Sequence, residues 1–230
     1  MIVEKKPQEW YIEKLVNRDW FAMGLIGDGE LIGAEKSRVD GMNAIEEVFT
    51  LPLCNDLDEV LRDAPDNYLI GTDPNFKGQH EEKQLDSYPA RTYYDGTMWD
   101  KAVREGNLSP FIRQLRTMNV GIIGGSHLIP LGWMMGVKTH ITIPSVNCYD
   151  RLEHVLGCVK EMDCEVWLLM MGLVAPVAAY RLQKQNPDRF FIDIGSVFDV
   201  FVGAGTNRGW RSELYADKTL WKQCVDKNLA

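Results

Sequence analysis

The sequence lacks the signatures of several large protein classes. It contains neither G-x-G-x-x-G nor G-x-x-x-x-G-K-[ST], which excludes the common dinucleotide fingerprint and the P-loop. Its five cysteines form no C-x-x-C pair, so neither a disulfide framework nor a zinc site is indicated, and we expect reduced, mostly buried thiols. No apolar stretch approaches the ~20 residues of a membrane span and no signal-peptide pattern opens the chain, so we expect a cytoplasmic protein without a membrane segment.

Positive charge is also scarce. The 230 residues carry 25 Lys and Arg against 33 Asp and Glu, a net charge of -8, which weighs against broad electrostatic binding to nucleic acid and leaves only a local basic groove for such contacts. With 45% hydrophobic residues the chain can bury one large core. We predict a single domain over residues 1–230, in which residues 204–230 form a C-terminal tail that packs on the rest.

Short apolar runs alternate with segments of helical periodicity. The runs show no polar alternation and are separated by helices of ~10–15 residues, a pattern typical of a parallel sheet covered on both faces. We therefore predict an α/β fold, a single Rossmann-like domain with a mostly parallel sheet and helices on both faces. The expected strands lie at 20–26, 68–71, 120–125, 140–144, 166–171 and 190–194, and the expected helices at 8–17, 109–119, 147–162 and 176–185.

Two segments before residue 100 are harder to assign. Apolar spacing predicts short helices near 44–49 and 57–61, the second with Asn55 or Asp56 as its N-cap. Residues 76–95 are the least regular part of the chain, polar at first and then rich in aromatic residues. Long irregular segments in compact domains are often functional or mobile loops.

An acidic loop follows the first apolar strand. Asp28 and Glu30 are separated by glycine, and Gly27 and Gly29 permit a tight turn in which both carboxylates converge on one point. Converging carboxylates repel each other unless a cation lies between them, and hard oxygen ligands suit Mg²⁺ or Mn²⁺. We predict a metal site here, with a plain exposed acidic turn as the alternative interpretation.

Other polar and glycine residues follow the later strands. Ligands of such sheets bind beyond the carboxyl ends of the strands, so these loops are candidate binding residues. Gly124 and Gly125 either admit a phosphate or form only a turn, and His127 is either a phosphate donor, a base or neither. Asn147 is most simply a helix cap. Asp193 lies inside an apolar strand and needs partners if buried, so we expect it to organise a site or a backbone network.

Five of these segments together resemble the GT-D-type glycosyltransferases, in the order that this family has them. The similarity covers roughly residues 20 to 203. The segments are 26–30, 120–125, 144–150, 168–172 with the helix that follows, and 192–195. The chain departs from the family at Leu25, where arginine or a similar polar residue is frequent, and at Ser196, where histidine is common.

The resemblance implies a function and a set of site residues. It implies transfer of a sugar from a nucleotide diphosphate sugar, with a UDP-sugar as the expected donor, and Asp28 and Glu30 binding Mn²⁺ or Mg²⁺ beside the diphosphate. An inverting transfer also needs a base, for which Asp199 or Asp193 are candidates by location. Candidate nucleotide-sugar contacts are Gly27, Gly124, Gly125, Ser126, His127, Ser145, Asn147, Gly172, Arg208 and Arg211. The last two belong to a tail that either clamps the diphosphate or docks as a terminal helix.

Three functional hypotheses follow. The first is a metal-dependent glycosyltransferase that acts on a hydroxyl of a glycan or glycoconjugate. The second is the same chemistry on a hydroxylated base of modified, phage-type DNA, which the acidic composition disfavours. The third is a non-catalytic nucleotide-binding or scaffold protein, because a fold alone does not establish a function. The sequence does not indicate the oligomeric state.

Overall fold

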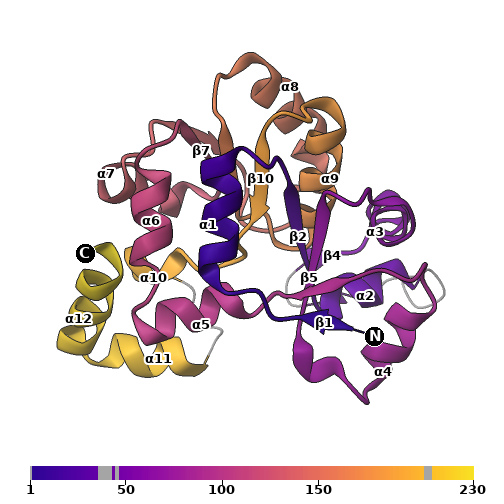
Figure 1. Ribbon diagram of the computed structural model, residues 1–230, viewed down its shortest axis with the longest axis horizontal. Coiled ribbons are helices and arrows are strands. Elements are labelled where there is room, and N and C mark those ends of the chain that lie inside the picture. The colour runs from indigo at the N-terminus through magenta and orange to yellow at the C-terminus, as the bar shows by residue number, and fades with distance from the viewer. Residues whose placement is uncertain (1, 36–42, 45–46, 205–208) are drawn as a thin grey trace.

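An eight-stranded sheet forms the centre of the computed structural model, which describes residues 2–35, 43–44, 47–204 and 209–230 (Figure 1). Its strand order is β1-β6-β5-β2-β10-β9-β7-β8, and the described neighbouring pairs are all parallel. The strands are β1 (Val3–Glu4), β2 (Ala22–Ile26), β5 (Tyr68–Thr72), β6 (Tyr93–Asp95), β7 (Val120–Gly124), β8 (Thr139–Thr142), β9 (Val166–Leu169) and β10 (Phe190–Asp193). The predicted α/β fold with a parallel sheet is confirmed.

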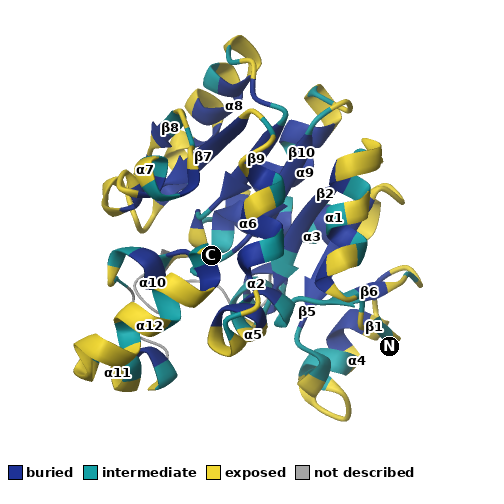
Figure 2. Ribbon diagram, turned by 60° about the vertical axis from the view of Figure 1, so that its left-hand side comes forward, coloured by how far each residue is buried: buried dark blue, intermediate teal, exposed yellow. Residues whose placement is uncertain are grey.

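Helices cover both faces of the sheet, as predicted. One core packs against α2 (Asp28–Ala34), α3 (Leu51–Asp63), α4 (His80–Asp86), α8 (Leu152–Glu161) and α9 (Ala175–Gln185). The other packs against α1 (Gln8–Asn17), α5 (Met98–Glu105), α6 (Ser109–Leu115), α7 (Leu131–Met135), α10 (Asp199–Val202), α11 (Gly209–Ala216) and α12 (Lys218–Leu229). The central strands lie buried between these layers in Figure 2.

The apolar runs of the sequence are explained by burial on both sides of the sheet. In β9, Val166 and Leu168 point into one core, while Trp167 and Leu169 point into the other. All four side chains are fully buried. Because successive residues of a strand face opposite sides, a strand covered on both faces needs apolar residues throughout.

The order of the strands creates a switch point between β2 and β10. After β2 the chain builds β5 and β6 on one side, and then crosses to the other side for β7, β8 and β9 before β10 returns to pair with β2. Ligands of open α/β sheets bind outside the carboxyl ends of the strands at such a point. The acidic loop follows β2 directly.

The structure corrects the predictions for two segments of the first half. Where a helix was expected near residues 44–49, the described residues form a short antiparallel pair, β3 (Asn43–Ala44) and β4 (Glu47–Val48). The next helix begins earlier than expected, because Thr50 rather than Asn55 or Asp56 provides the cap. The Thr50 hydroxyl accepts a hydrogen bond from the Leu53 amide at 3.4 Å.

Residues 76–95 contain more regular structure than their composition indicates. They include α4 and the strand β6, which pairs with β5 and β1. Only Gln84 and Leu85 of α4 are buried, and β6 is three residues long, so neither element produces a clear periodic pattern.

The C-terminal helices pack on α5 and α6. The buried Asn228 amide donates to the Val103 carbonyl at 3.0 Å, and its oxygen accepts from the Leu108 amide at 3.0 Å. The Trp221 indole donates to the Val200 carbonyl at 2.7 Å. No helix of the described chain is both long and apolar enough to cross a membrane. The five cysteines are free thiols, three of them buried, as predicted.

Candidate functional site

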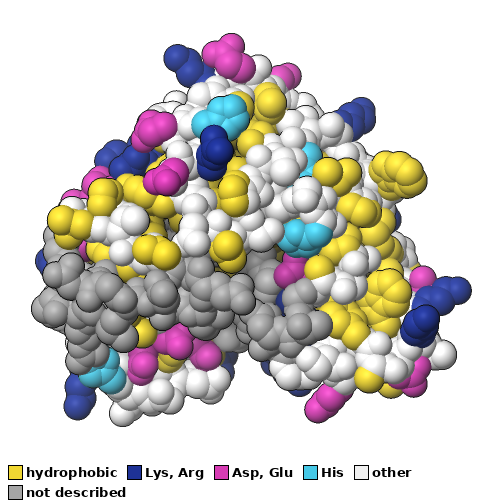
Figure 3. All heavy atoms as spheres, turned by 180° about the vertical axis from the view of Figure 1, so that it is seen from behind, with side chains coloured by type: hydrophobic (Ala, Val, Ile, Leu, Met, Phe, Trp, Pro, Cys, Tyr) yellow, Lys and Arg dark blue, Asp and Glu magenta, His cyan; other side chains and the backbone are white. Residues whose placement is uncertain are grey.

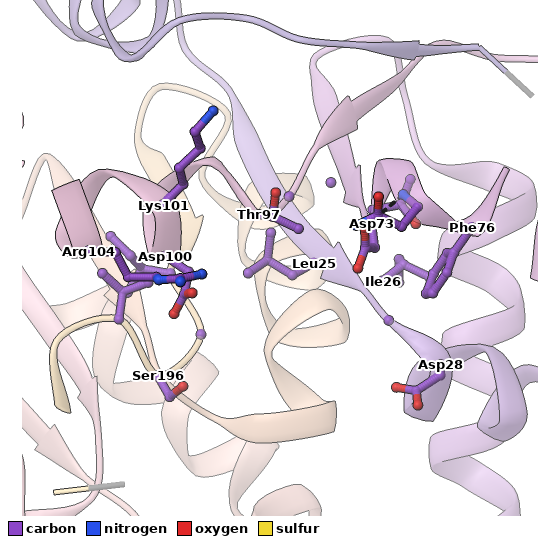
Figure 4. A pocket seen from close by; sticks show the side chains of 18 of the residues that line it. Leu25, Ile26, Asp28, Asp73, Phe76, Thr97, Asp100, Lys101, Arg104 and Ser196 are labelled. Atoms are coloured by element: carbon purple, nitrogen blue, oxygen red, sulfur yellow. Dashed lines mark hydrogen bonds between the residues drawn. The ribbon is translucent and has the colours of Figure 1, made fainter. Parts of the chain in front are cut away.

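A cavity of about 870 Å³ opens at the carboxyl edge of the sheet beside the switch point (Figure 4). Its walls come from the ends of β2, β5 and β10, from the 3₁₀ turn Pro74–Phe76, and from α5. Asp100, Lys101 and Arg104 of α5 lie along one wall in Figure 4, and Asp73 and Phe76 lie on the opposite side. Asp28 and Ser196 both lie in the lower part of Figure 4. Gly96 and Thr97, which follow β6, also line it, so the cavity brings together loops from the four strands β2, β5, β6 and β10.

Gly71 and Gly96 line the cavity where the backbone of β5 and the backbone before α5 approach each other closely. A Cβ atom at Gly96 would lie 3.0 Å from the carbonyl carbon of Gly71 and 3.0 Å from the Thr72 nitrogen. These are backbone atoms of the adjacent strand, which cannot move aside cheaply. Glycine at position 96 therefore lets the start of α5 approach β5 closely.

The acidic loop is the first turn of helix α2. Asp28 is exposed and lines the cavity together with Gly27, and its Oδ1 accepts a hydrogen bond from the Gly29 amide at 2.9 Å. The Glu30 side chain turns back, and its Oε2 accepts from the Gly27 amide at 2.8 Å. This contact is one half of a capping box and fixes the Glu30 carboxylate beside the end of β2.

The donor set of this loop suits one kind of metal site. In the described part of the chain no group of three or more His, Cys, Asp or Glu side chains could enclose an ion. Mg²⁺ and Mn²⁺ do not need such a cage, because they commonly bind one or two protein carboxylates and complete their shell with water and substrate phosphate oxygens. Asp28 and Glu30 fit an ion of that type.

Asp193 is buried at the end of β10 and forms the backbone network predicted for it. Its Oδ2 accepts from the Leu25 amide and its Oδ1 from the Gly195 amide, both at 2.9 Å. Burial raises the pKa of Asp193 to about 7, the two amide donors oppose this rise, and the charge of Glu30 adds to it. Asp193 is not among the residues that line the cavity; it ties β2 to the loop after β10.

A second group of predicted residues meets at the edge next to β7. The His127 Nε2 lies 3.2 Å from Asp199 Oδ1, and the Arg211 Nη1 lies 3.7 Å from Asp199 Oδ2. Arg211 is fully buried, and its Nη2 lies 3.4 Å from Oδ1 of Asp100 in the cavity wall. A chain of polar and charged side chains thus links His127 to the cavity through α10, α11 and α5.

The glycine pair after β7 allows close packing of this group. A Cβ atom at Gly125 would lie 2.6 Å from the His127 ring and 2.6 Å from the Ser145 hydroxyl, so both side chains rest against this residue. Ser126, His127 and Ser145 are exposed, while Gly124 is buried. None of these residues lines the cavity of about 870 Å³.

The remaining predicted residues lie elsewhere or outside the described chain. Gly172 is exposed after β9, and Leu173 beside it approaches α2, since a Cβ atom at Gly29 would lie 2.9 Å from its side chain. Asn147 occupies the N-cap position of the 3₁₀ turn Cys148–Arg151, as the predicted helix cap requires, but its side chain makes no capping hydrogen bond. Its backbone is left-handed, and its side-chain oxygen accepts from the Val48 amide at 2.6 Å, because a tertiary partner is within reach. Arg208 lies outside the described residues.

Several cavity residues were not predicted from the sequence as site residues. Thr72 and Asp73 follow a predicted strand, so the rule used for the other loops could have found them. The Thr72 Oγ1 is buried and has no hydrogen-bond partner among the described residues. Lys101 and Arg104 gave no signal, because α5 and the short strand before it were not predicted.

Comparison with known proteins identifies the fold. No protein-family model matches the chain, and no curated protein matches it. A solved structure of the highly conserved domain of unknown function 1792, described as a distinct glycosyltransferase fold, superposes with a TM-score of 0.67 over 93% of this chain and 82% of that chain. The two sequences are 15% identical. The chain therefore has this distinct glycosyltransferase fold, which confirms the predicted GT-D resemblance at the level of architecture.

Proposed function

We propose that this protein is a metal-dependent glycosyltransferase that moves a sugar from a nucleotide diphosphate sugar, with UDP as the expected nucleotide, to a hydroxyl of a glycan or glycoconjugate. One observation carries the proposal. The acidic loop, one of the five segments that carry the GT-D resemblance, places Asp28 at a large cavity beside the switch point of a chain with a glycosyltransferase fold. Fold alone would not suffice, because one fold hosts many functions.

The chemistry of the cavity supports a nucleotide sugar as the ligand. Its volume falls in the range of ~300–1,000 Å³ that is usual for small-molecule sites. Lys101 and Arg104 on α5 supply positive charge for a diphosphate, and Phe76 supplies a flat ring for a base or sugar (Figure 4). The buried Thr72 hydroxyl supplies a further polar group at the end of β5.

Asp28 and Glu30 would hold Mn²⁺ or Mg²⁺ next to the diphosphate. The ion supplies positive charge for the leaving diphosphate as the glycosidic bond breaks. Gly27 gives its amide to the Glu30 carboxylate and so fixes the orientation of that side chain. Asp193 stabilises the end of β2 before this loop, because its carboxylate accepts the hydrogen bond of the Leu25 amide.

A glycan or glycoconjugate is preferred over modified DNA as the acceptor. In an acidic chain, binding to a DNA backbone would depend on local groups of basic side chains, and Arg211 of the tail is one candidate. Arg211 is fully buried between Asp100 and Asp199, so its charge is not available to a phosphate backbone. A non-catalytic nucleotide-binding or scaffold role is the outcome if the chain binds no nucleotide sugar.

Thermal unfolding with a panel of nucleoside diphosphates and nucleotide sugars, with and without Mn²⁺, tests the proposal. The variant Asp28→Asn, Glu30→Gln removes both carboxylates but keeps a side-chain oxygen at position 30 that can accept the Gly27 hydrogen bond. The matched control Glu9→Gln, Glu13→Gln removes the same charge from the exposed surface of α1. We expect one nucleotide sugar to stabilise wild type and control only with metal, by about 2.7 kcal/mol at a hundredfold excess over its Kd, and not to stabilise the double variant. If no member of the panel stabilises the wild type, the proposal is wrong.

A further inference from the structure

We infer that His127 is the base that accepts the proton of the acceptor hydroxyl, and that Asp199 is its positioning residue, held in turn by the buried Arg211. This inference rests on the proposed function and adds an acceptor side and a stereochemical outcome to it. It also decides between alternatives that the sequence left open, since Asp199 and Asp193 were candidate bases and His127 was a phosphate donor, a base or neither.

Asp199 is engaged on both of its oxygens. Oδ1 faces His127 Nε2 at 3.2 Å, and Oδ2 faces Arg211 Nη1 at 3.7 Å. The Asp199 side chain is 14% exposed, whereas that of His127 is 39% exposed. A carboxylate placed between an imidazole and a buried guanidinium is suited to orient the imidazole, and the more exposed imidazole is suited to meet a substrate.

The two nitrogens of His127 have different surroundings. With Nε2 directed to Asp199, Nδ1 is the nitrogen left to accept a proton, because a neutral imidazole donates from one nitrogen and accepts at the other. Nδ1 lies on the side of Gly125 and Ser145, since a Cβ atom at Gly125 would lie 2.6 Å from both Nδ1 and the Ser145 hydroxyl. His127 and Ser145 therefore present an acceptor and a hydroxyl next to each other at the exposed edge.

Two contacts connect this pair to the cavity. The Asp199 amide donates to the carbonyl of Ser196, a cavity residue, at 3.1 Å. Arg211 joins Asp199 to Asp100, which also lines the cavity. The pair thus stands beside the cavity, as a separate acceptor side of one site would.

The surface beyond His127 is open and partly apolar. Ile129 is 53% exposed and Trp133 is 94% exposed, and both follow His127 closely in the chain. Figure 3 shows hydrophobic side chains gathered on the side of the molecule where α7 lies. An acceptor can reach His127 from this side without passing through the donor cavity.

The proposed step balances as follows. The acceptor oxygen forms a bond to the anomeric carbon of the donor sugar while its proton moves to His127 Nδ1. The bond between that carbon and the diphosphate oxygen breaks, and its electron pair leaves with the nucleoside diphosphate. A single displacement of this kind inverts the configuration at the anomeric carbon, and His127 later releases the proton to water.

Transfer rates of His127→Gln, His127→Ala and Asp199→Asn, beside the control His154→Gln on the exposed surface of α8, test the inference. We expect His127→Gln to lower kcat for transfer by about 10²–10⁴ while metal-dependent stabilisation by the donor stays at its wild-type value. Asp199→Asn should lower kcat by a smaller factor, about tenfold. Added imidazole should restore part of the transfer by His127→Ala but none of the loss in Asp199→Asn, and the product should carry the inverted anomer.

The role of His127 as base and the proposed function are contradicted by different results. Transfer by His127→Gln within threefold of wild type, or a product with retained configuration, would overturn the role of His127 as base. Loss of donor stabilisation in His127→Gln would make His127 a donor ligand instead. If the wild type transfers no sugar from any donor, the proposed function itself is wrong. If the wild type transfers sugar and His127→Gln is equally active, only this inference is wrong.

Discussion

At the centre of the sheet, beside the switch point between β2 and β10, loops and α5 enclose a cavity of about 870 Å³, whereas toward the β7–β8 edge Ser126, His127 and Ser145 are exposed. In the first region, glycines allow close backbone approach, and the buried Asp193 carboxylate accepts hydrogen bonds from two backbone amides. The second is built from side-chain charges that Arg211 links to the cavity wall. Under the proposed function, the enclosed region takes the donor and the exposed region takes the acceptor, and a variant that affects one region only would separate their roles.

The largest expected effect concerns Asp193 under the enclosed region. Its pKa is raised by burial to about 7 in the folded protein, so the folded state binds the proton more tightly than the unfolded state. The stabilisation from this tighter proton binding is fully present below pH ~4 and is lost as the pH rises to ~7. The free energy of unfolding falls by about 4 kcal/mol over this window. Asp193→Asn cannot titrate, so we expect the difference in stability between wild type and variant to change by that amount across this window.

Urea unfolding from pH 4 to 8 in a chelating buffer measures this difference. Asp163→Asn, which removes an exposed carboxylate before β9, is the matched control for the loss of one negative charge. A flat difference for Asp193→Asn would mean that folding does not raise the pKa of Asp193, against our account of the enclosed region.

Arg211 is the link between the two regions, and its loss should affect both. Arg211→Met keeps much of the side-chain volume but leaves Asp100 and Asp199 without the cation between them. Removing one partner of a buried charge pair costs up to 3–5 kcal/mol, and since both carboxylates are partly exposed we expect about 3 kcal/mol. Chemical denaturation measures this cost, and Arg113→Met, at an exposed position of α6, is the control. A cost below ~0.5 kcal/mol would show that the link does not hold the two regions together.

Thr72 offers the smallest and most local test of the enclosed region. Its hydroxyl is buried without a partner among the described residues, so Thr72→Val should leave the free protein unchanged or about 1 kcal/mol more stable. If the hydroxyl serves the donor, the same variant should weaken donor binding by about fivefold to tenfold. Ser145→Ala, its counterpart in the open region, should leave donor binding unchanged. Equal losses of donor affinity in Thr72→Val and Ser145→Ala would contradict the assignment of donor binding to the enclosed region alone.

The sequence predicted the sheet well because its signal is local. Strands such as Val166–Leu169 are buried on both faces and therefore read as continuous apolar runs, and the turn after β2 carries its own acidic residues. Asp193 was also predictable, since a carboxylate inside an apolar strand needs partners.

The missed features depend on contacts between distant parts of the chain. Arg211 meets Asp100 from 111 positions away, and Asn147 reaches Val48 across 99 positions, so no local pattern reports either contact. Lys101 and Arg104 enter the cavity only because the three-residue strand β6 pairs with β5 and places α5 beside it. The irregular composition of residues 76–95 concealed that strand.

Metal-dependent release of sugar from the donor, to water or to an acceptor sugar, is the measurement that tests the central claim most directly. We expect wild type and the Glu9→Gln, Glu13→Gln control to release sugar with Mn²⁺ or Mg²⁺, to stop when the metal is chelated and to resume when it is restored. The Asp28→Asn, Glu30→Gln variant should fold normally and lose at least ~10²-fold in rate. Equal rates in that variant, or rates unchanged by chelation, would contradict the assignment of a metal-assisted transfer to this cavity.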